Sequence, residues 1–151
     1  MRSVILDTNL LLLLVVGETD RKMIGRHKRL RAYQEEDFDW VQNAVKVSKG
    51  LVFCPNIVTE TSNLVRYAPT SDAALVAQAL KVILEQFPEH YVPSQQAATR
   101  TEYTRLGVTD AVLLALAETH ATLVTDDLDL ALAAAYAGAD VINYNHIRDH
   151  R

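Results

Sequence analysis

The sequence contains a single cysteine, Cys54, in the apolar context Leu51 to Cys54. One cysteine excludes an internal disulfide, and it also excludes a zinc knuckle built from several thiolates. The five histidines show no spacing typical of metal ligands, so we predict that they are surface or core residues. These absences favour a reducing, cytoplasmic environment and a site chemistry that uses neither thiols nor imidazoles.

Long hydrophobic runs are also absent. The longest uninterrupted apolar stretch, Leu10 to Val16, is too short to span a bilayer, which takes about 20 residues. Asp7 interrupts its extension toward the N-terminus and disfavours a signal peptide. No repeat, linker or low-complexity tract divides the 151 residues. We therefore expect one globular domain over residues 1–151, with no membrane segment.

The net charge of −4 is unfavourable for binding nucleic acids, but the charges are unevenly distributed. A basic segment between Arg21 and Arg31 contains most of the local positive charge, and the stretch from about 18 to 34 has no clear periodicity. We predict a basic loop or irregular helix there. Because local basic density neutralises phosphates, Arg26, Lys28 and Arg29 are candidate RNA-binding residues. The alternative is a solvated charged surface.

Short apolar stretches alternate with segments of helical periodicity. Strands are predicted at 4–7, 51–54, 90–93, 122–125 and 140–143. Helices are predicted from a cap at Thr8 or Asn9 up to Gly17, and over 34–49, 56–65, 72–87, 109–117 and 128–137. Strands that alternate with helices at these spacings predict βαβ units. We therefore expect an α/β fold of three layers, α/β/α, with a central, mostly parallel sheet of about five strands.

Four acidic residues occupy equivalent positions in this pattern. Asp7 and Asp127 follow strands, whereas Glu60 and Asp110 lie near the starts of helices. In a parallel sheet, strand carboxyl ends and helix amino ends share one edge, where such folds bind ligands. Clustered carboxylates repel each other, and a hard divalent cation with oxygen ligands would offset that repulsion. The sequence therefore predicts a Mg²⁺ or Mn²⁺ site. Asp126 and Asp129 are either further ligands or helix caps.

The same residues resemble a known family. Leu6-Asp7-Thr8-Asn9 near the start, Val58-Thr59-Glu60 on a helix, the Thr109-Asp110 helix opening and Leu123 to Asp127 look like the PIN domain, the fold of many VapC-type toxin ribonucleases. The resemblance covers nearly the whole chain. It implies that Asp7, Glu60, Asp110 and Asp127 are the catalytic, metal-binding acids. It also implies that Asn9 and Thr125 support them.

The resemblance implies a metal-dependent endoribonuclease that cleaves single-stranded RNA with a metal-activated water and leaves a 3′-hydroxyl and a 5′-phosphate. The protein would be the toxin of a toxin–antitoxin pair, so an antitoxin protein is an expected partner, and we also expect a homodimer.

Two alternatives remain open. A phosphatase of the haloacid dehalogenase class also places an Asp after its first strand, but it needs a second Asp where this chain has Asn9. A catalytically inert RNA-binding module on the same fold is the other alternative, because a fold alone does not determine function.

Overall fold

The computed structural model describes residues 2–150 and has an α/β fold that is mostly helical. Three parallel strands form its sheet in the order β1 (Ser3–Leu6), β2 (Ala121–Thr125), β3 (Val141–Asn143). Ser3 is paired with Ala121 in one ladder, and Leu123 with Val141 in the other. All three strands therefore end at the same edge of the sheet, which we call the rim.

The prediction of about five strands is wrong. Residues 51–54 form only isolated bridges, in which Leu51 pairs with Val4 and Phe53 pairs with Glu89. Residues 90–93 form no strand. Phe53 accepts from the His90 backbone N–H and donates to the Pro88 carbonyl, which anchors the segment at one end. The stretch between Pro88 and Pro93 is short, and neither proline has an N–H for a ladder. Pairing with residues 51–54 therefore does not extend along it.

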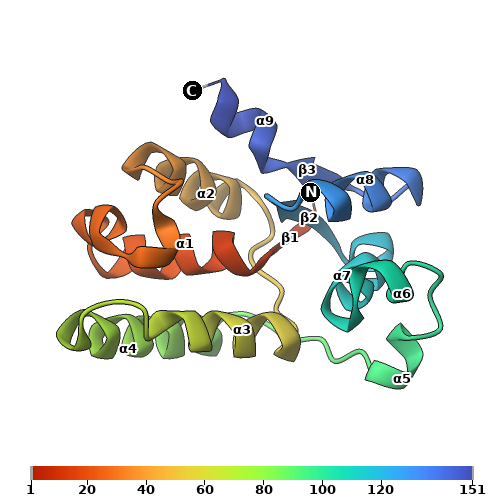
Figure 1. The fold of residues 1–151 in the computed structure, drawn as a ribbon, viewed down its shortest axis with the longest axis horizontal. Helices are drawn as coiled ribbons and strands as arrows, with labels where there is room; N and C mark the ends of the chain where they lie inside the picture. Colours follow the sequence, from red (N-terminus) through yellow and green to blue (C-terminus); the bar gives the residue numbers. More distant parts are fainter. Residues whose placement is uncertain (1, 151) are drawn as a thin grey trace.

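Helix α1 (Thr8–Thr19) forms the centre of the molecule, and its residues Leu10 to Gly17 are buried. It lies between α2 (Glu35–Val47) on one side and the pair α3 (Pro55–Val65) and α4 (Thr70–Gln86) on the other, as Figure 1 shows. The prediction that Gly17 ends this helix is wrong. A Cβ on Gly17 would lie 2.1 Å from the Phe38 ring, so this glycine permits close packing of α2 on α1 rather than a helix stop.

The basic segment folds into two short 3₁₀ helices, η1 (Arg21–Arg26) and η2 (Lys28–Leu30), in agreement with the predicted irregular helix. Met23, Ile24 and Leu30 are buried and anchor it to the core. The polar stretch that follows residue 93 contains α5 (Ser94–Ala97) and α6 (Tyr103–Leu106). In both segments, the charged side chains are therefore carried by short helical turns and not by an extended backbone.

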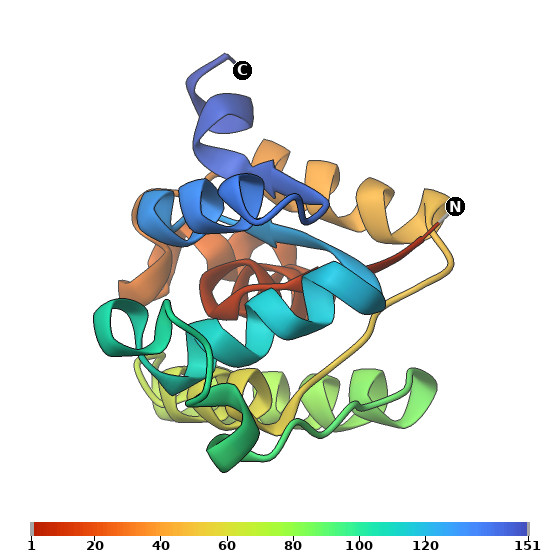
Figure 2. The same ribbon diagram turned by 90° about the vertical axis from the view of Figure 1, so that its right-hand side faces the viewer.

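The remaining helices complete both sides of the sheet. They are α7 (Val108–Thr119), α8 (Leu128–Tyr136) and α9 (Tyr144–Asp149). Figure 2 shows α7 on one side of β2 and α2 on the other. Helix α9 was not predicted; its buried Tyr144 packs edge-on against Trp40 of α2, with ring centroids 5.1 Å apart. Between residues 2 and 150, no helix combines the length and the apolar character that crossing a membrane requires.

Candidate functional site

Asp7 lies at the rim, between the end of β1 and the start of α1. One carboxylate oxygen, Oδ1, accepts from the Thr8 backbone N–H at 2.8 Å, and the other accepts from the Thr125 hydroxyl at 2.6 Å. Asp7, not Thr8 or Asn9, is therefore the N-cap of α1. Asp7 can both cap α1 and belong to the site, because its second carboxylate oxygen faces β2.

Thr125 connects Asp7 to Asp127. Its buried hydroxyl donates to Asp7 Oδ2 and accepts from the Asp127 backbone N–H at 3.0 Å. Asp127 is the N-cap of α8, with Oδ1 accepting from Leu130 N–H at 3.2 Å. The residue that the sequence marks as supporting thus lies between two of the four acids.

Glu60 extends from α3 toward the same rim. Its two carboxylate oxygens accept from the hydroxyls of Thr8, at 2.8 Å, and Thr109, at 3.0 Å. Thr109 begins the predicted helix 109–117, but in the structure it is not the N-cap of α7. Gly107, with φ +90°, occupies the N-cap position, and Thr109 lies in the first turn. Neither threonine was predicted as a partner of Glu60, since a hydroxyl in a first turn is normally interpreted as a cap.

Asp110 has the most perturbed electrostatics of the four acids. It is partly buried, and it makes no side-chain hydrogen bond or ion pair to any residue in 2–150. Burial, and then the negative charges of Asp7, Asp127 and Glu60, raise the pKa of Asp110 to about 7. Burial also raises the pKa of Asp7, with smaller contributions from the Asp126 and Asp127 charges. The structure therefore brings the four predicted acids close enough to repel.

These acids are not arranged as a ready metal centre. No three Asp, Glu, His or Cys side chains of residues 2–150 are grouped closely enough to hold an ion. Protein hydrogen bonds already hold Asp7, Glu60 and Asp127, as described above. The repulsion and the wide spacing are compatible, because charges interact over several ångströms whereas ligand oxygens lie within about 2.6 Å of a cation. Coordination would require side chains to rotate toward one another.

Asp126 is held by Asn9, which was predicted to support the four acids, and by Tyr33 and Asn145, which the sequence did not indicate. Its Oδ2 accepts from Asn9 Nδ2 at 3.1 Å and from the Tyr33 hydroxyl, and its carbonyl accepts from Asn145 at 2.7 Å. Burial, and then the bond to Asp126, raise the pKa of Tyr33, so its hydroxyl remains a donor. Asp129 differs, because it is exposed on the first turn of α8 and makes no hydrogen bond or ion pair with residues 2–150.

The three candidate RNA-binding residues have different environments. Arg26 pairs with Asp72 at the start of α4 through two hydrogen bonds, at 2.8 and 3.3 Å. Arg29 places its guanidinium 5.4 Å from the centre of the Tyr67 ring, just beyond α3. Lys28 is exposed and forms no ion pair within the described chain. The basic segment thus packs on the α3–α4 junction, along α3 from Glu60, and does not share the acidic rim.

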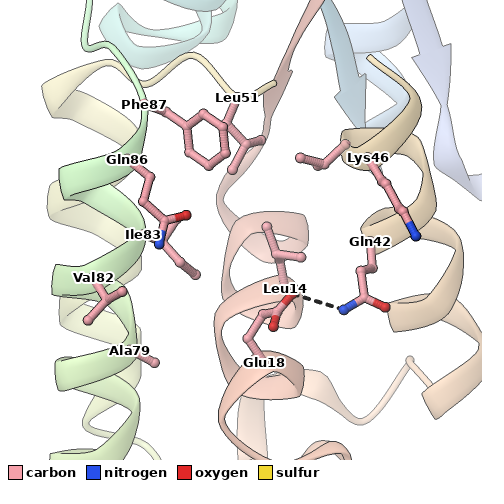
Figure 3. A pocket seen from close by; sticks show the side chains of 11 residues that line it. Leu14, Glu18, Gln42, Lys46, Leu51, Ala79, Val82, Ile83, Gln86 and Phe87 are labelled. Atoms are coloured by element: carbon pink, nitrogen blue, oxygen red, sulfur yellow. Dashed lines mark hydrogen bonds between the residues drawn. The ribbon is translucent and has the colours of Figure 1, made fainter. Parts of the chain in front are cut away.

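Two hollows differ in their relation to the acids. One of about 390 Å³ is lined by Glu60 and Thr109, together with residues of α3 and of the 91–94 segment. A larger one of about 610 Å³ lies between α1, α2 and α4 (Figure 3). Leu14, Ile83 and Phe87 make it mainly apolar, and a 3.0 Å hydrogen bond joins Gln42 to Glu18 at its side. None of the four acids lines this larger groove.

Comparisons of the chain with protein-family models, with curated proteins and with solved structures found no match. Function is therefore inferred from the site itself. Asp7, Glu60, Asp110 and Asp127 come from four separate parts of the chain to one rim, where the other three repel Asp110 and where Glu60 lines a hollow. Such a concentration of negative charge attracts cations.

Proposed function

We propose that this protein is a Mg²⁺- or Mn²⁺-dependent endoribonuclease that cleaves single-stranded RNA, as its resemblance to PIN-domain toxins implies. One observation carries the proposal: Asp110 is uncompensated and is repelled by three other acids that the fold brings to it. Such a cluster opposes folding unless a ligand uses it, and strongly perturbed carboxyl groups in a hollowed region are characteristic of functional sites.

The donor set suits a hard cation. Carboxylate oxygens are the ligands that Mg²⁺ and Mn²⁺ prefer, and a cation among Asp7, Asp110 and Asp127 would remove the repulsion that raises the pKa of Asp110. Glu60 would complete the set from α3. A bound ion would supply an activated water and offset negative charge on the leaving oxygen.

The chain's own residues would hold the site in shape. Thr125 fixes Asp7 and the Asp127 backbone together, while Thr8 and Thr109 hold the Glu60 carboxylate from two elements. Asp126 and its partners Tyr33 and Asn9 would fix the start of the loop that carries Asp127. We therefore assign Asp126 a positioning role rather than a place among the ligands.

RNA would approach along α3. Lys28 and Arg29 are exposed in the direction of its C-terminal end and would neutralise phosphates, whereas the Asp72 carboxylate occupies Arg26. An antitoxin protein and a second copy of this chain remain proposed partners on the same basis as the proposed toxin activity. The basic segment thus offers fewer free cations than its composition suggests.

The phosphatase alternative is less well supported. Its mechanism needs an acid two residues after the nucleophile, and here Asn9 occupies that position and donates to Asp126. No proton-transfer group is therefore available where that chemistry requires one. An inert RNA-binding module is the remaining alternative, and it predicts RNA binding without cleavage.

A cleavage assay tests the proposal. Labelled single-stranded RNA should be cut in Mn²⁺, should remain intact in excess EDTA, and should yield 3′-hydroxyl and 5′-phosphate ends. The Asp7→Asn variant should bind RNA without cutting it. Full cleavage in EDTA, or RNA binding without cleavage by the wild type under all cation conditions, would reject the proposed activity.

A further inference from the structure

The hollow beside Glu60 has an unusual lining for a surface depression. Glu60 and Thr109, which belong to the acidic rim, line it together with the polar residues Asn56, Thr59 and Ser94. The side-chain polar atoms of these last three make no hydrogen bond to any residue in 2–150. Unpaired amide and hydroxyl groups next to the rim are free to bind a polar ligand.

Tyr91 provides the aromatic side of this hollow. Its side chain is 74% exposed, and its ring and hydroxyl have no ring contact or hydrogen bond within residues 2–150. Its backbone is nevertheless constrained, because His90 N–H donates to the Phe53 carbonyl at 2.7 Å and Pro93 follows two residues later. A bare aromatic face on a fixed backbone can stack on a flat ligand with little loss of conformational freedom.

A second hollow adjoins the first at Tyr91. Tyr91 and Val92 line this second hollow of about 550 Å³, to which Gln96, Arg100 and His120 contribute. The two hollows therefore share a wall, and together they extend from the acidic rim to the far end of α7. A ligand long enough to cross Tyr91 would contact both hollows.

We propose that the hollow beside Glu60 binds a nucleobase of the RNA strand, with the base stacked on Tyr91 and its edge hydrogen-bonded by Asn56. This inference rests on the proposed ribonuclease function. Aromatic residues beside nucleic-acid channels stack on bases of any sequence, whereas an amide can both donate to and accept from a base edge. Tyr91 thus contributes affinity, and Asn56 contributes preference among bases.

Binding measurements with Tyr91 variants test the proposal. Fluorescence anisotropy with labelled homopolymeric RNAs, in Mn²⁺ and on the non-cleaving Asp7→Asn background, gives the Kd without strand loss. Tyr91→Ala should weaken binding by roughly 5-fold to 100-fold, as expected for the loss of one stacked base. Tyr91→Phe and Tyr91→Trp, which keep an aromatic face, should bind nearly as the parent does. Tyr136→Ala, at a 96% exposed tyrosine on α8, is the matched control and should have no effect.

The outcomes separate this inference from the proposed function. An abasic RNA strand should bind the parent and Tyr91→Ala equally, and Asn56→Ala should reduce the differences in Kd among the homopolymers. If Tyr91→Ala binds and cleaves RNA as the wild type does, the base site is wrong and the ribonuclease proposal stands. If Tyr91→Phe is as weak as Tyr91→Ala, stacking is rejected in favour of a role for the hydroxyl. If the wild type neither binds nor cuts RNA, both proposals fail.

Discussion

The acidic rim and the basic segment both concentrate charge, but they differ in whether those charges form ion pairs within the fold. In the basic segment, Arg21 pairs with Asp39 at 2.8 Å and Arg26 pairs with Asp72. At the rim, Asp110 has no cationic partner among residues 2–150 and is repelled by the acids around it. Much of the basic segment's charge stabilises local structure, whereas the charge at the rim is left uncompensated.

This difference shows why density of charge in a sequence is an incomplete guide to a binding site. Paired charges satisfy each other within the fold, but a cluster of one sign retains its potential for a ligand. The rim therefore predicts a cation site more firmly than the basic segment predicts an RNA site. Substitutions made separately in the two regions should therefore produce effects of different kind and size.

The largest effect is expected from neutralising a rim acid. Asp110→Asn removes one carboxylate from the proposed cation site, and a cation contributes several kcal/mol to transition-state stabilisation. Cleavage of single-stranded RNA should therefore fall by at least about 100-fold. Asp129→Asn, at an exposed position in the first turn of α8, should cleave at the wild-type rate. Equal losses in the two variants would mean that surface charge in general, and not the rim, supports activity.

A second expected effect concerns stability without metal. The pKa of Asp110 is about 7 in the folded protein, above its ordinary value of 3.8, so the folded state holds a proton that the unfolded chain has released. Stability from this group is complete below pH 4 and is lost as the pH rises to about 7. Asp110→Asn lacks this titration. Its free energy of unfolding, relative to that of the wild type, should therefore rise by on the order of 2 kcal/mol from pH 4 to pH 7.

Urea unfolding in EDTA, measured across that pH range for both proteins, gives this difference directly. A wild-type protein whose stability relative to Asp110→Asn does not change with pH would contradict the repulsion. Asp129→Asn again serves as the control, because an exposed carboxylate should leave the pH dependence of the wild type unchanged.

A smaller effect is expected at the support of the rim. Tyr33→Phe removes the hydroxyl that donates to Asp126 and should lower the free energy of unfolding by about 1 kcal/mol. Asp126→Asn retains an acceptor and should reduce cleavage less than Asp7→Asn does. An Asp126→Asn variant as inactive as Asp7→Asn would place Asp126 among the ligands instead.

The smallest effects are expected in the basic segment, and they should divide by residue. Lys28→Gln and Arg29→Gln should each reduce the slope of log Kd against log salt by about 0.7, as one lost phosphate contact on single-stranded RNA. Arg26→Gln should leave the slope unchanged and lower the melting temperature, because Asp72 loses its partner. If Arg26→Gln flattens the slope as much as Lys28→Gln, the Asp72 pair opens on binding RNA and the division is wrong.

The sequence predicted the α/β fold and the convergence of Asp7, Glu60, Asp110 and Asp127, because strand ends and helix starts share an edge in any parallel sheet. It did not predict how Asp126 is held. Tyr33 and Asn145 reach it from segments that are adjacent only after folding, and neither carries a local pattern. Asp126 was therefore predicted to be either a further ligand or a helix cap.

The predicted strands at 51–54 and 90–93 failed for a related reason. Short apolar runs are compatible with a strand, but a ladder forms only where both partners have N–H groups to donate. The prolines at 88 and 93 remove such groups from one partner. Gly17 was misinterpreted in the same way. Its small size leaves room for the Phe38 ring of the neighbouring helix, and no local sequence pattern reveals that contact.

The central claim is that the uncompensated acids at the rim form a cation site, and the melting temperature in Mn²⁺ tests it most directly. A cation that binds only the folded state stabilises it by about 2.7 kcal/mol at a hundredfold excess over its Kd. The wild type should therefore melt at a higher temperature in Mn²⁺ than in EDTA, and Asp110→Asn and Asp127→Asn should lose most of that shift while Asp129→Asn keeps it. A wild type whose melting temperature is the same in Mn²⁺ and in EDTA would contradict the account.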